Sequence, residues 1–123
     1  MPNHRIVFAH FIRQPPLTWK RQGATGKFRW TEKKLMAKAK ENLGWEIKAA
    51  EPKLRVNACA RFGYRAEFHI WNRADGDNLE KLLMDALQGI VWLNDEQVDE
   101  GAWVKKIVSR EAGIKLLIYE IEP

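Results

Sequence analysis

Residues 75–98 read DGDNLEKLLMDALQGIVWLNDEQV, a stretch that places an acidic turn at each end of a helical pattern. Apolar side chains recur within it at steps of three or four residues, at Leu79, Leu82, Leu83, Ala86, Leu87 and Ile90. This spacing predicts an amphipathic helix that ends close to Gly89. It is the clearest element of the sequence, and the other elements are predicted around it.

Strands are predicted on both sides of this helix. Residues 6–12 form an apolar run, and residues 54–62 alternate apolar and polar side chains, continuing after a turn at Gly63 to residue 71. Residues 103–108 and 114–121 are rich in β-branched side chains and are expected to form a β-hairpin.

A first helix is expected before the second strand. Thr31 can cap it, and Leu35, Ala39 and Leu43 give its apolar stripe. It ends or bends at Gly44, or continues until residue 50. Residues 18–30, with two glycines, four cations and three aromatic side chains but no period, predict a mobile basic loop. The predicted strands and helices together indicate the fold class α/β (α+β). A length of 123 residues, 46% of them hydrophobic, predicts one domain over residues 1–123.

Several classes of protein are disfavoured by composition. A single cysteine, Cys59, cannot form an intramolecular disulfide, and it is expected to be buried and inert. The three histidines have no ligand-like spacing. The apolar run near the start contains His10 and precedes Arg13, so it predicts a strand rather than a signal peptide or membrane span. We therefore expect a cytoplasmic protein without a membrane partner.

Charge is distributed unevenly along the chain. Residues 1–55 hold 13 Lys and Arg against 4 Asp and Glu, whereas residues 56–123 hold 8 against 12. Two interpretations remain open: the asymmetry serves solubility and self-complementarity, or a surface for a polyanion lies beside a carboxylate cluster that holds metal.

The acidic turns supply that cluster. Asp75 and Asp77 stand at a helix start, where a simple capping role is one explanation. Two carboxylates about 4 Å apart repel each other by about 4 kcal/mol at an effective dielectric near 20, and a divalent cation would offset this cost. Oxygen ligands without thiols select a hard ion such as Mg²⁺, while the spacing disfavours an EF-hand. The second turn, Asn94–Gln97, adds further acidity.

A polar ridge extends the first acidic turn along the helix. Asp77, Lys81 and Asp85 follow each other at intervals of four residues. Carboxylate-held Mg²⁺ and a lysine that stabilises the transition state are what phosphodiester hydrolysis needs, and the basic loop and first helix would hold flanking phosphates.

Residues 73–81 (RADGDNLEK), Asp85-Ala86-Leu87 and residues 92–98 (WLNDEQV) resemble the signature of RusA-type Holliday-junction resolvases, small Mg²⁺-dependent endonucleases of bacteria and their prophages. The resemblance covers about a fifth of the chain. It implies a homodimer with a mixed sheet flanked by helices, and an enzyme that cleaves four-way junctions in DNA recombination and repair.

The resemblance also implies roles for single residues. Asp75, Asp77 and Asp95 would be the catalytic metal ligands, for Mg²⁺ or Mn²⁺ in its place, and Lys81 the catalytic lysine. The family often has two successive aspartates where this chain has Asn94-Asp95, so Asn94 receives a supporting role only. Asp85 fits an orienting salt bridge as well as a ligand.

The expected partner is branched DNA. Its phosphates would be contacted by cations of the basic loop and the acidic motif: Lys20, Arg21, Lys27, Arg29 and Arg73. Most of the six tryptophans are expected in the core or a dimer interface, while Trp19 and Trp30 are candidates for stacking on unpaired bases. Two alternatives stay open: a branched-DNA-binding module without catalysis, and a nuclease for flaps or other branched DNA.

Overall fold

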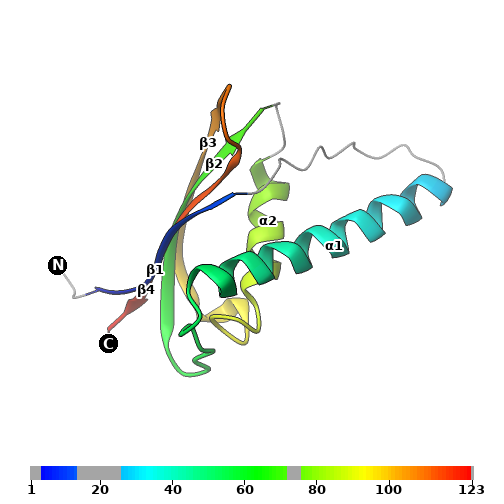
Figure 1. The fold of residues 1–123 in the computed structure, drawn as a ribbon. Coiled ribbons are helices and arrows are strands. Elements are labelled where there is room, and N and C mark those ends of the chain that lie inside the picture. Colours follow the sequence, from blue (N-terminus) through cyan, green and yellow to red (C-terminus); the bar gives the residue numbers. More distant parts are fainter. Residues whose placement is uncertain (1–3, 14–25, 72–75, 123) are drawn as a thin grey trace.

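A four-stranded sheet carries both helices on one of its faces (Figure 1). The computed structural model describes residues 4–13, 26–71 and 76–122, and for residues 26–33, 35 and 36 it describes the backbone only. In chain order the elements are β1 (His4–Arg13), α1 (Gly26–Ala50), β2 (Arg61–Ile70), α2 (Gly76–Leu87), the 3₁₀ turn η1 (Asp95–Gln97), β3 (Val98–Ile107) and β4 (Gly113–Ile121). The predicted α+β class, with a mixed sheet and two main helices in one domain, is confirmed.

The sheet has the strand order β1-β4-β2-β3. β4 is antiparallel to both of its neighbours, whereas β2 and β3 are parallel and are joined through α2. A parallel pair needs such a crossover, which places the connecting helix on one face of the sheet. The predicted hairpin of residues 103–108 and 114–121 is therefore wrong, because β2 lies between β3 and β4. Composition predicted a strand in both places, although β3 begins at Val98 rather than at residue 103, and it carries no information about which strands pair.

Helix α1 begins earlier than predicted and ends at the later of the two expected positions. Its backbone is helical from Gly26, so the expected loop is wrong for residues 26–30, and Thr31 lies inside the helix instead of capping it. It passes through Gly44 to Ala50, which confirms the longer of the two alternatives. Gly44 is buried, and an added Cβ would lie 3.1 Å from Cδ1 of Ile90. Glycine here serves close packing against the segment after α2 and does not end the helix.

The second strand begins later than its alternating pattern predicts. Residues 54–60 are irregular, and Asn57 Oδ1 accepts from the N–H groups of Cys59 and Ala60 at 3.0 and 3.1 Å, which removes these two donors from strand pairing. Gly63 is a strand residue of β2 rather than a turn. The ring of Tyr119 on β4 occupies the place where a side chain at position 63 would lie. Glycine in a strand often marks such an approach of a neighbouring group.

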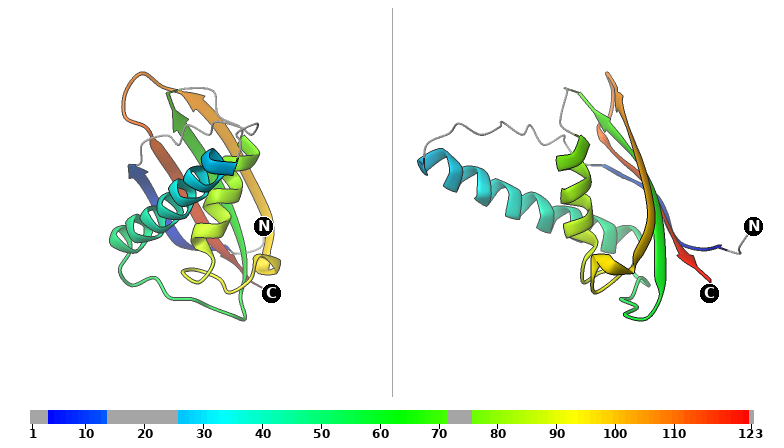
Figure 2. Two further views of the ribbon diagram at one scale, coloured as in Figure 1. Left: turned by 90° about the vertical axis from the view of Figure 1, so that its right-hand side faces the viewer. Right: turned by 180° about the vertical axis from the view of Figure 1, so that it is seen from behind.

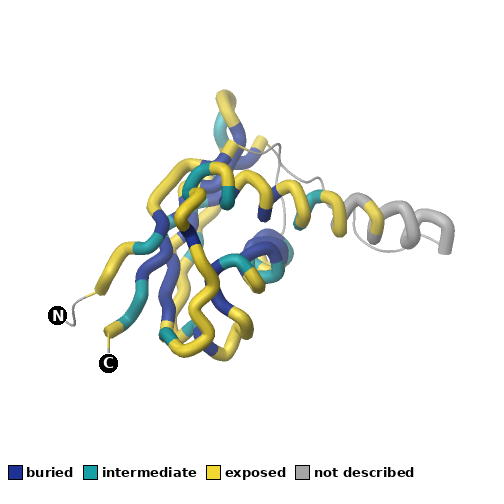
Figure 3. Tube along the Cα trace, turned by 60° about the horizontal axis from the view of Figure 1, so that its bottom comes forward, coloured by how far each residue is buried: buried dark blue, intermediate teal, exposed yellow. Residues whose placement is uncertain are grey.

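The hydrophobic core lies between the sheet and the two helices (Figure 2). The predicted apolar stripe of α2 is confirmed, with Leu79, Leu82, Leu83, Ala86 and Leu87 all buried. The chain leaves the helix at Gly89, whose φ of 86° favours glycine. Figure 3 shows α2 as mostly buried, while α1 is exposed over much of the part whose burial is described.

Three smaller expectations can be compared with the structure. Cys59 is exposed, so its predicted burial is wrong; the irregular loop removes it from the strand on which burial was expected. Trp92 is fully buried, but Trp45 and Trp71 are 68% and 51% exposed. Among the described residues, no helix is long and apolar enough to cross a membrane.

Candidate functional site

Asp77 stands in the first turn of α2 and is exposed. The free N–H groups and the dipole at a helix start favour a carboxylate there. Gly76, directly before it, is buried against the sheet side of the helix. Two other predicted residues of this turn, Arg73 and Asp75, lie outside the described residues.

Lys81 follows Asp77 by one helical turn and is also exposed. Residues four apart on a helix are surface neighbours, with Cβ atoms about 6 Å from each other. The leucine stripe buries the opposite side of α2, so the carboxylate and the ammonium group share the outer side of the helix near its start.

Asp85 stands one turn further along α2 and forms an ion pair with Lys40 of α1, with 3.7 Å between Nζ and Oδ2. The two side chains are 36% and 44% exposed, so solvent screens the pair and its contribution to stability is small. The geometry matches an orienting contact between the two helices.

Asp95 opens the turn η1, beyond the other end of α2. It is exposed, and its Oδ1 accepts a hydrogen bond of 3.3 Å from Nε1 of Trp92, whose ring is fully buried. Asn94 caps the turn, since its Oδ1 accepts from the N–H of Glu96 at 2.9 Å. In the structure, Asn94 thus shapes the turn that carries Asp95.

Gln97 is a supporting residue that the sequence analysis missed. It is the one buried polar side chain among the described residues. Its Oε1 accepts from the N–H groups of Leu93 and Asn94, and its Nε2 donates to the carbonyls of Asn57 and Ala60 at 2.7 and 2.9 Å. The spacing Asn94-x-x-Gln97 is that of a capping box, and this signal was available in the sequence.

The two acidic turns lie at opposite ends of α2 (Figure 1). Twelve helical residues span about 18 Å at 1.5 Å per residue; Asp77 stands near the start of this helix, and Asp95 follows its other end. The described residues, which do not include Asp75, contain no group of three or more His, Cys, Asp or Glu that could hold a metal. The structure therefore brings Asp77 and Lys81 together but leaves Asp95 apart from them within one chain.

The predicted DNA contacts fall largely on parts of the chain that the structure does not describe. Lys20 and Arg21 lie outside the described residues. Lys27 and Arg29 belong to the first turns of α1, of which only the backbone is described. This end of α1 projects beyond the sheet (Figure 1), so cations on it stand on an extension of the molecule.

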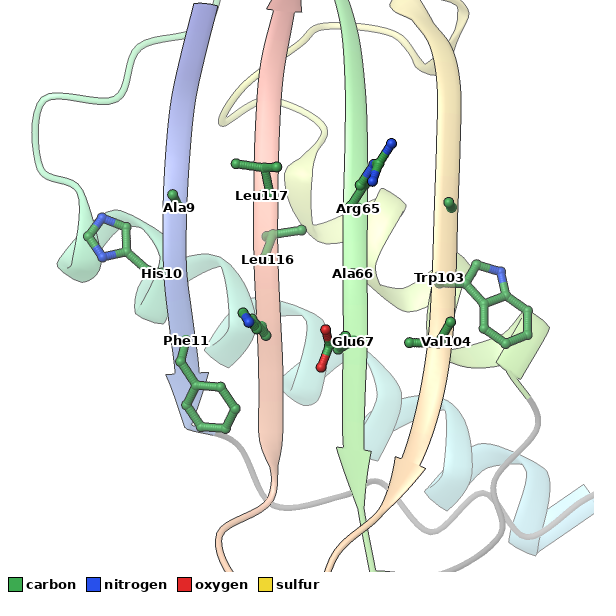
Figure 4. A pocket seen from close by; sticks show the side chains of 12 residues that line it. Ala9, His10, Phe11, Arg65, Ala66, Glu67, Trp103, Val104, Leu116 and Leu117 are labelled. Atoms are coloured by element: carbon green, nitrogen blue, oxygen red, sulfur yellow. The ribbon is translucent and has the colours of Figure 1, made fainter.

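A separate hollow of about 630 Å³ lies on the face of the sheet without helices (Figure 4). Its floor is apolar, with Ala9, Leu117 and Val104, and Arg65, Glu67 and Lys115 add charge. Neither Asp77 nor Asp95 lines it. The hollow is therefore distinct from the acidic turns, which belong to the helix side of the sheet.

The fold and the acidic turns define a class: a small α+β protein with a basic N-terminal half and an exposed carboxylate and lysine at the start of its crossover helix. Residues 14–119 match the family described as endodeoxyribonuclease RusA, which covers most of the chain, and the chain belongs to this family. No match is found among curated proteins. Membership in a family of DNA endonucleases agrees with the resemblance of residues 73–98 and supports a nuclease.

Proposed function

We propose that this protein is a Mg²⁺-dependent endonuclease that resolves four-way DNA junctions as a homodimer, in DNA recombination and repair. Membership in the RusA family supports DNA cleavage. The observation that carries the proposal is the exposed pair Asp77 and Lys81 on one side of α2, with Asp75 two residues before Asp77 in the sequence. Its place of action would be the cytoplasm, where bacterial and prophage DNA is found.

The carboxylates at the start of α2 fit a hard cation. Asp77 is an exposed residue with a carboxylate, and Asp75 adds a second carboxylate two residues away in sequence. Mg²⁺, or Mn²⁺ in its place, would bring positive charge to the scissile phosphate and help to activate water. Lys81 would bind a phosphate oxygen from the same side of the helix and stabilise the charge that grows on it.

We propose that Asp95 reaches the site from a second copy of the chain. Within one chain it lies beyond the far end of α2, a helix about 18 Å long. A two-fold axis perpendicular to α2 would reverse the direction of this helix in the partner, so the Asp95 end of one copy could meet the Asp77 end of the other. The same symmetry produces two sites, as two cuts across a junction require.

Cleavage of a labelled four-way junction, with and without Mg²⁺, tests the catalytic proposal. Asp77→Asn should abolish cleavage and leave junction binding unchanged or tighter, because negative charge near phosphate is lost. Asp85→Asn is the matched control on the same helix, since Asp85 already pairs with Lys40. Junction binding by the wild type without Mg²⁺-dependent cutting would instead favour a binding module, and equal cutting of flaps would favour a broader nuclease.

A mixture of two inactive variants tests the shared site. In a dimer of one Asp77→Asn chain and one Asp95→Asn chain, each shared site takes residue 77 from one copy and residue 95 from the other. One site then carries both changes, and the other site keeps both aspartates. One nick per junction should therefore return on mixing. If each site used both residues of a single chain, every site would carry one change and no activity would return.

The basic half is proposed to hold the DNA backbone. Each phosphate contact that is lost should flatten the logarithmic salt dependence of binding by roughly 0.9, so alanine at all four loop and helix cations should reduce the slope by roughly 3 to 4. These cations are Lys20, Arg21, Lys27 and Arg29. An unchanged affinity and slope would place the DNA contacts elsewhere.

A further inference from the structure

Trp103 of β3 packs directly against the first residue of α2. Gly76 is buried, and a Cβ added to it would come closer than 3.0 Å to three atoms of the six-membered ring of Trp103. The φ of Gly76 is not positive, so packing rather than backbone conformation demands glycine here. In Figure 4 the indole extends past the outer edge of β3, and its ring contacts Phe68 edge-on with 6.4 Å between centroids. The indole thus supports the residue that immediately precedes Asp77.

Tyr64 of β2 forms a second contact one turn further along the helix. Its ring is buried, and its hydroxyl donates a hydrogen bond to the carboxylate of Glu80, the neighbour of Lys81. Burial, together with Glu80, raises the pKa of Tyr64 far above its usual range, so the hydroxyl remains a neutral donor. The ring needs Gly101 beside it, because a Cβ at that position would overlap the ring.

The strand register arranges these groups as complementary pairs. Tyr64 lies beside Gly101, and two residues further along both strands Ala66 lies beside Trp103. Each large side chain has a small neighbour on the adjacent strand. The two aromatic rings therefore meet α2 at successive levels, one at Gly76 and the other at Glu80.

We propose that Trp103 and Tyr64 are positioning residues that fix the first turns of α2, and through them the carboxylate of Asp77 and the amine of Lys81. This inference rests on the proposed metal-dependent function. Both rings act from the buried side of the helix, whereas Asp77 and Lys81 are exposed on the other. Neither aromatic residue is a ligand; each acts through its neighbour in the helix.

Direct Mn²⁺ binding to the full-length protein, followed by electron paramagnetic resonance of free Mn²⁺, separates positioning from general packing. Tyr64→Phe removes one hydroxyl, and Trp103→Phe withdraws the ring from Gly76. Changes in groups that orient metal ligands typically weaken affinity 10- to 100-fold, and about tenfold is expected here. The kcat for junction cleavage should fall while the KM for the junction stays the same.

Tyr119→Phe is the matched control. Tyr119 also lies over a glycine of the adjacent strand, Gly63, and its hydroxyl donates to Glu100 at 2.9 Å, but on the face of the sheet without helices. It should lose a similar hydrogen bond without changing Mn²⁺ affinity. Equal Mn²⁺ affinities for wild type, Tyr64→Phe and Trp103→Phe would overturn the inference, as would an equal loss in Tyr119→Phe.

A size exchange tests the contact at Gly76. Gly76→Ala alone should weaken Mn²⁺ binding, and combination with Trp103→Phe should restore part of it because the shorter ring makes room. Additive losses would contradict the contact. Failure of the proposed function gives a different result: the wild type itself would not bind Mn²⁺ more tightly than Asp77→Asn, and the inference would fall with it.

Discussion

Replacement of Gln97 by leucine tests whether the turn bearing Asp95 is held by side-chain hydrogen bonds. Gln97 is 7% exposed and uses both ends of its amide, accepting two backbone N–H groups and donating to two carbonyls. Leucine has similar volume but leaves all four groups without this partner. A buried polar group left without a hydrogen bond costs about 1–3 kcal/mol. The backbone groups that Gln97 bonds belong to segments bordering solvent, so water can take over some of these hydrogen bonds and reduce the cost. We expect a total destabilisation of about 2–3 kcal/mol.

Thermal and urea denaturation followed by circular dichroism measure this loss. For a chain of this size, 1 kcal/mol corresponds to about 4 °C, so the Tm should fall by roughly 10 °C with little change in the urea m-value. Gln88→Leu, at an exposed glutamine, is the control and should change stability by less than about 0.5 kcal/mol. A loss for Gln97→Leu as small as that of the control would refute the reasoning.

Gln97→Glu adds a pH dependence of known sign. The variant keeps both acceptor positions but turns a carboxylate toward the carbonyls of Asn57 and Ala60. The protonated form can donate one of these bonds, so folding raises the pKa of the new carboxyl. Stability relative to the wild type should therefore be lost as the pH rises through this range, and the variant should be weaker at pH 7 than at pH 4. An equal deficit at both values would contradict the assignment of Nε2 to the carbonyls.

Two further predictions concern other parts of the fold. Hydrogen bonding, first to His69 and then to Lys106, lowers the pKa of Glu67 in the folded protein. The contribution of Glu67 to stability is therefore present above its ordinary pKa of about 4.3 and is lost as the pH falls through the lower folded pKa. Urea denaturation at a series of pH values from 5 downwards should show a smaller loss of stability for Glu67→Gln than for the wild type. Gly89→Ala should cost about 1 kcal/mol of stability in the same assay, because φ is 86° while no atom obstructs the added Cβ. Gly89→Asn should cost less, since asparagine tolerates this conformation better. Equal stability of the wild type and both variants would exclude backbone strain at this position.

Local sequence patterns predicted the elements whose stability depends on local burial. The stripe of α2 was identified because its leucines alone decide which side faces the sheet. The start of α1 and the first part of the predicted second strand were wrong, and for the strand the structure shows a reason. Asn57 bonds nearby backbone groups, and this competes with strand pairing although residues 54–60 alternate in polarity. The neighbour relations of β3 and β4 depend on contacts far apart in the sequence, which a local period cannot report.

The contacts of the candidate site also fall into those that a local pattern can predict and those that it cannot. Asp77 and Lys81 could be placed together from sequence because both belong to one helix, where a step of four residues gives one side. Gln97 could have been found from its capping-box spacing with Asn94. The contacts of Trp103 with Gly76 and of Tyr64 with Glu80 could not, since they require the parallel register of β2 and β3 and the height of α2 above it.

The separation of the two acidic turns follows from residues that have no chemical role in the proposed site. The buried leucines of α2 hold the helix against the sheet along its whole length, and the crossover from β2 to β3 determines which end each turn occupies. Asp77 and Asp95 are therefore close in the sequence motif but lie towards opposite ends of α2 (Figure 1). This separation would keep one chain from completing the proposed site by itself. If both carboxylates serve one metal, the requirement for a second copy is thus a consequence of the hydrophobic core, and cleavage and dimerisation should be lost together.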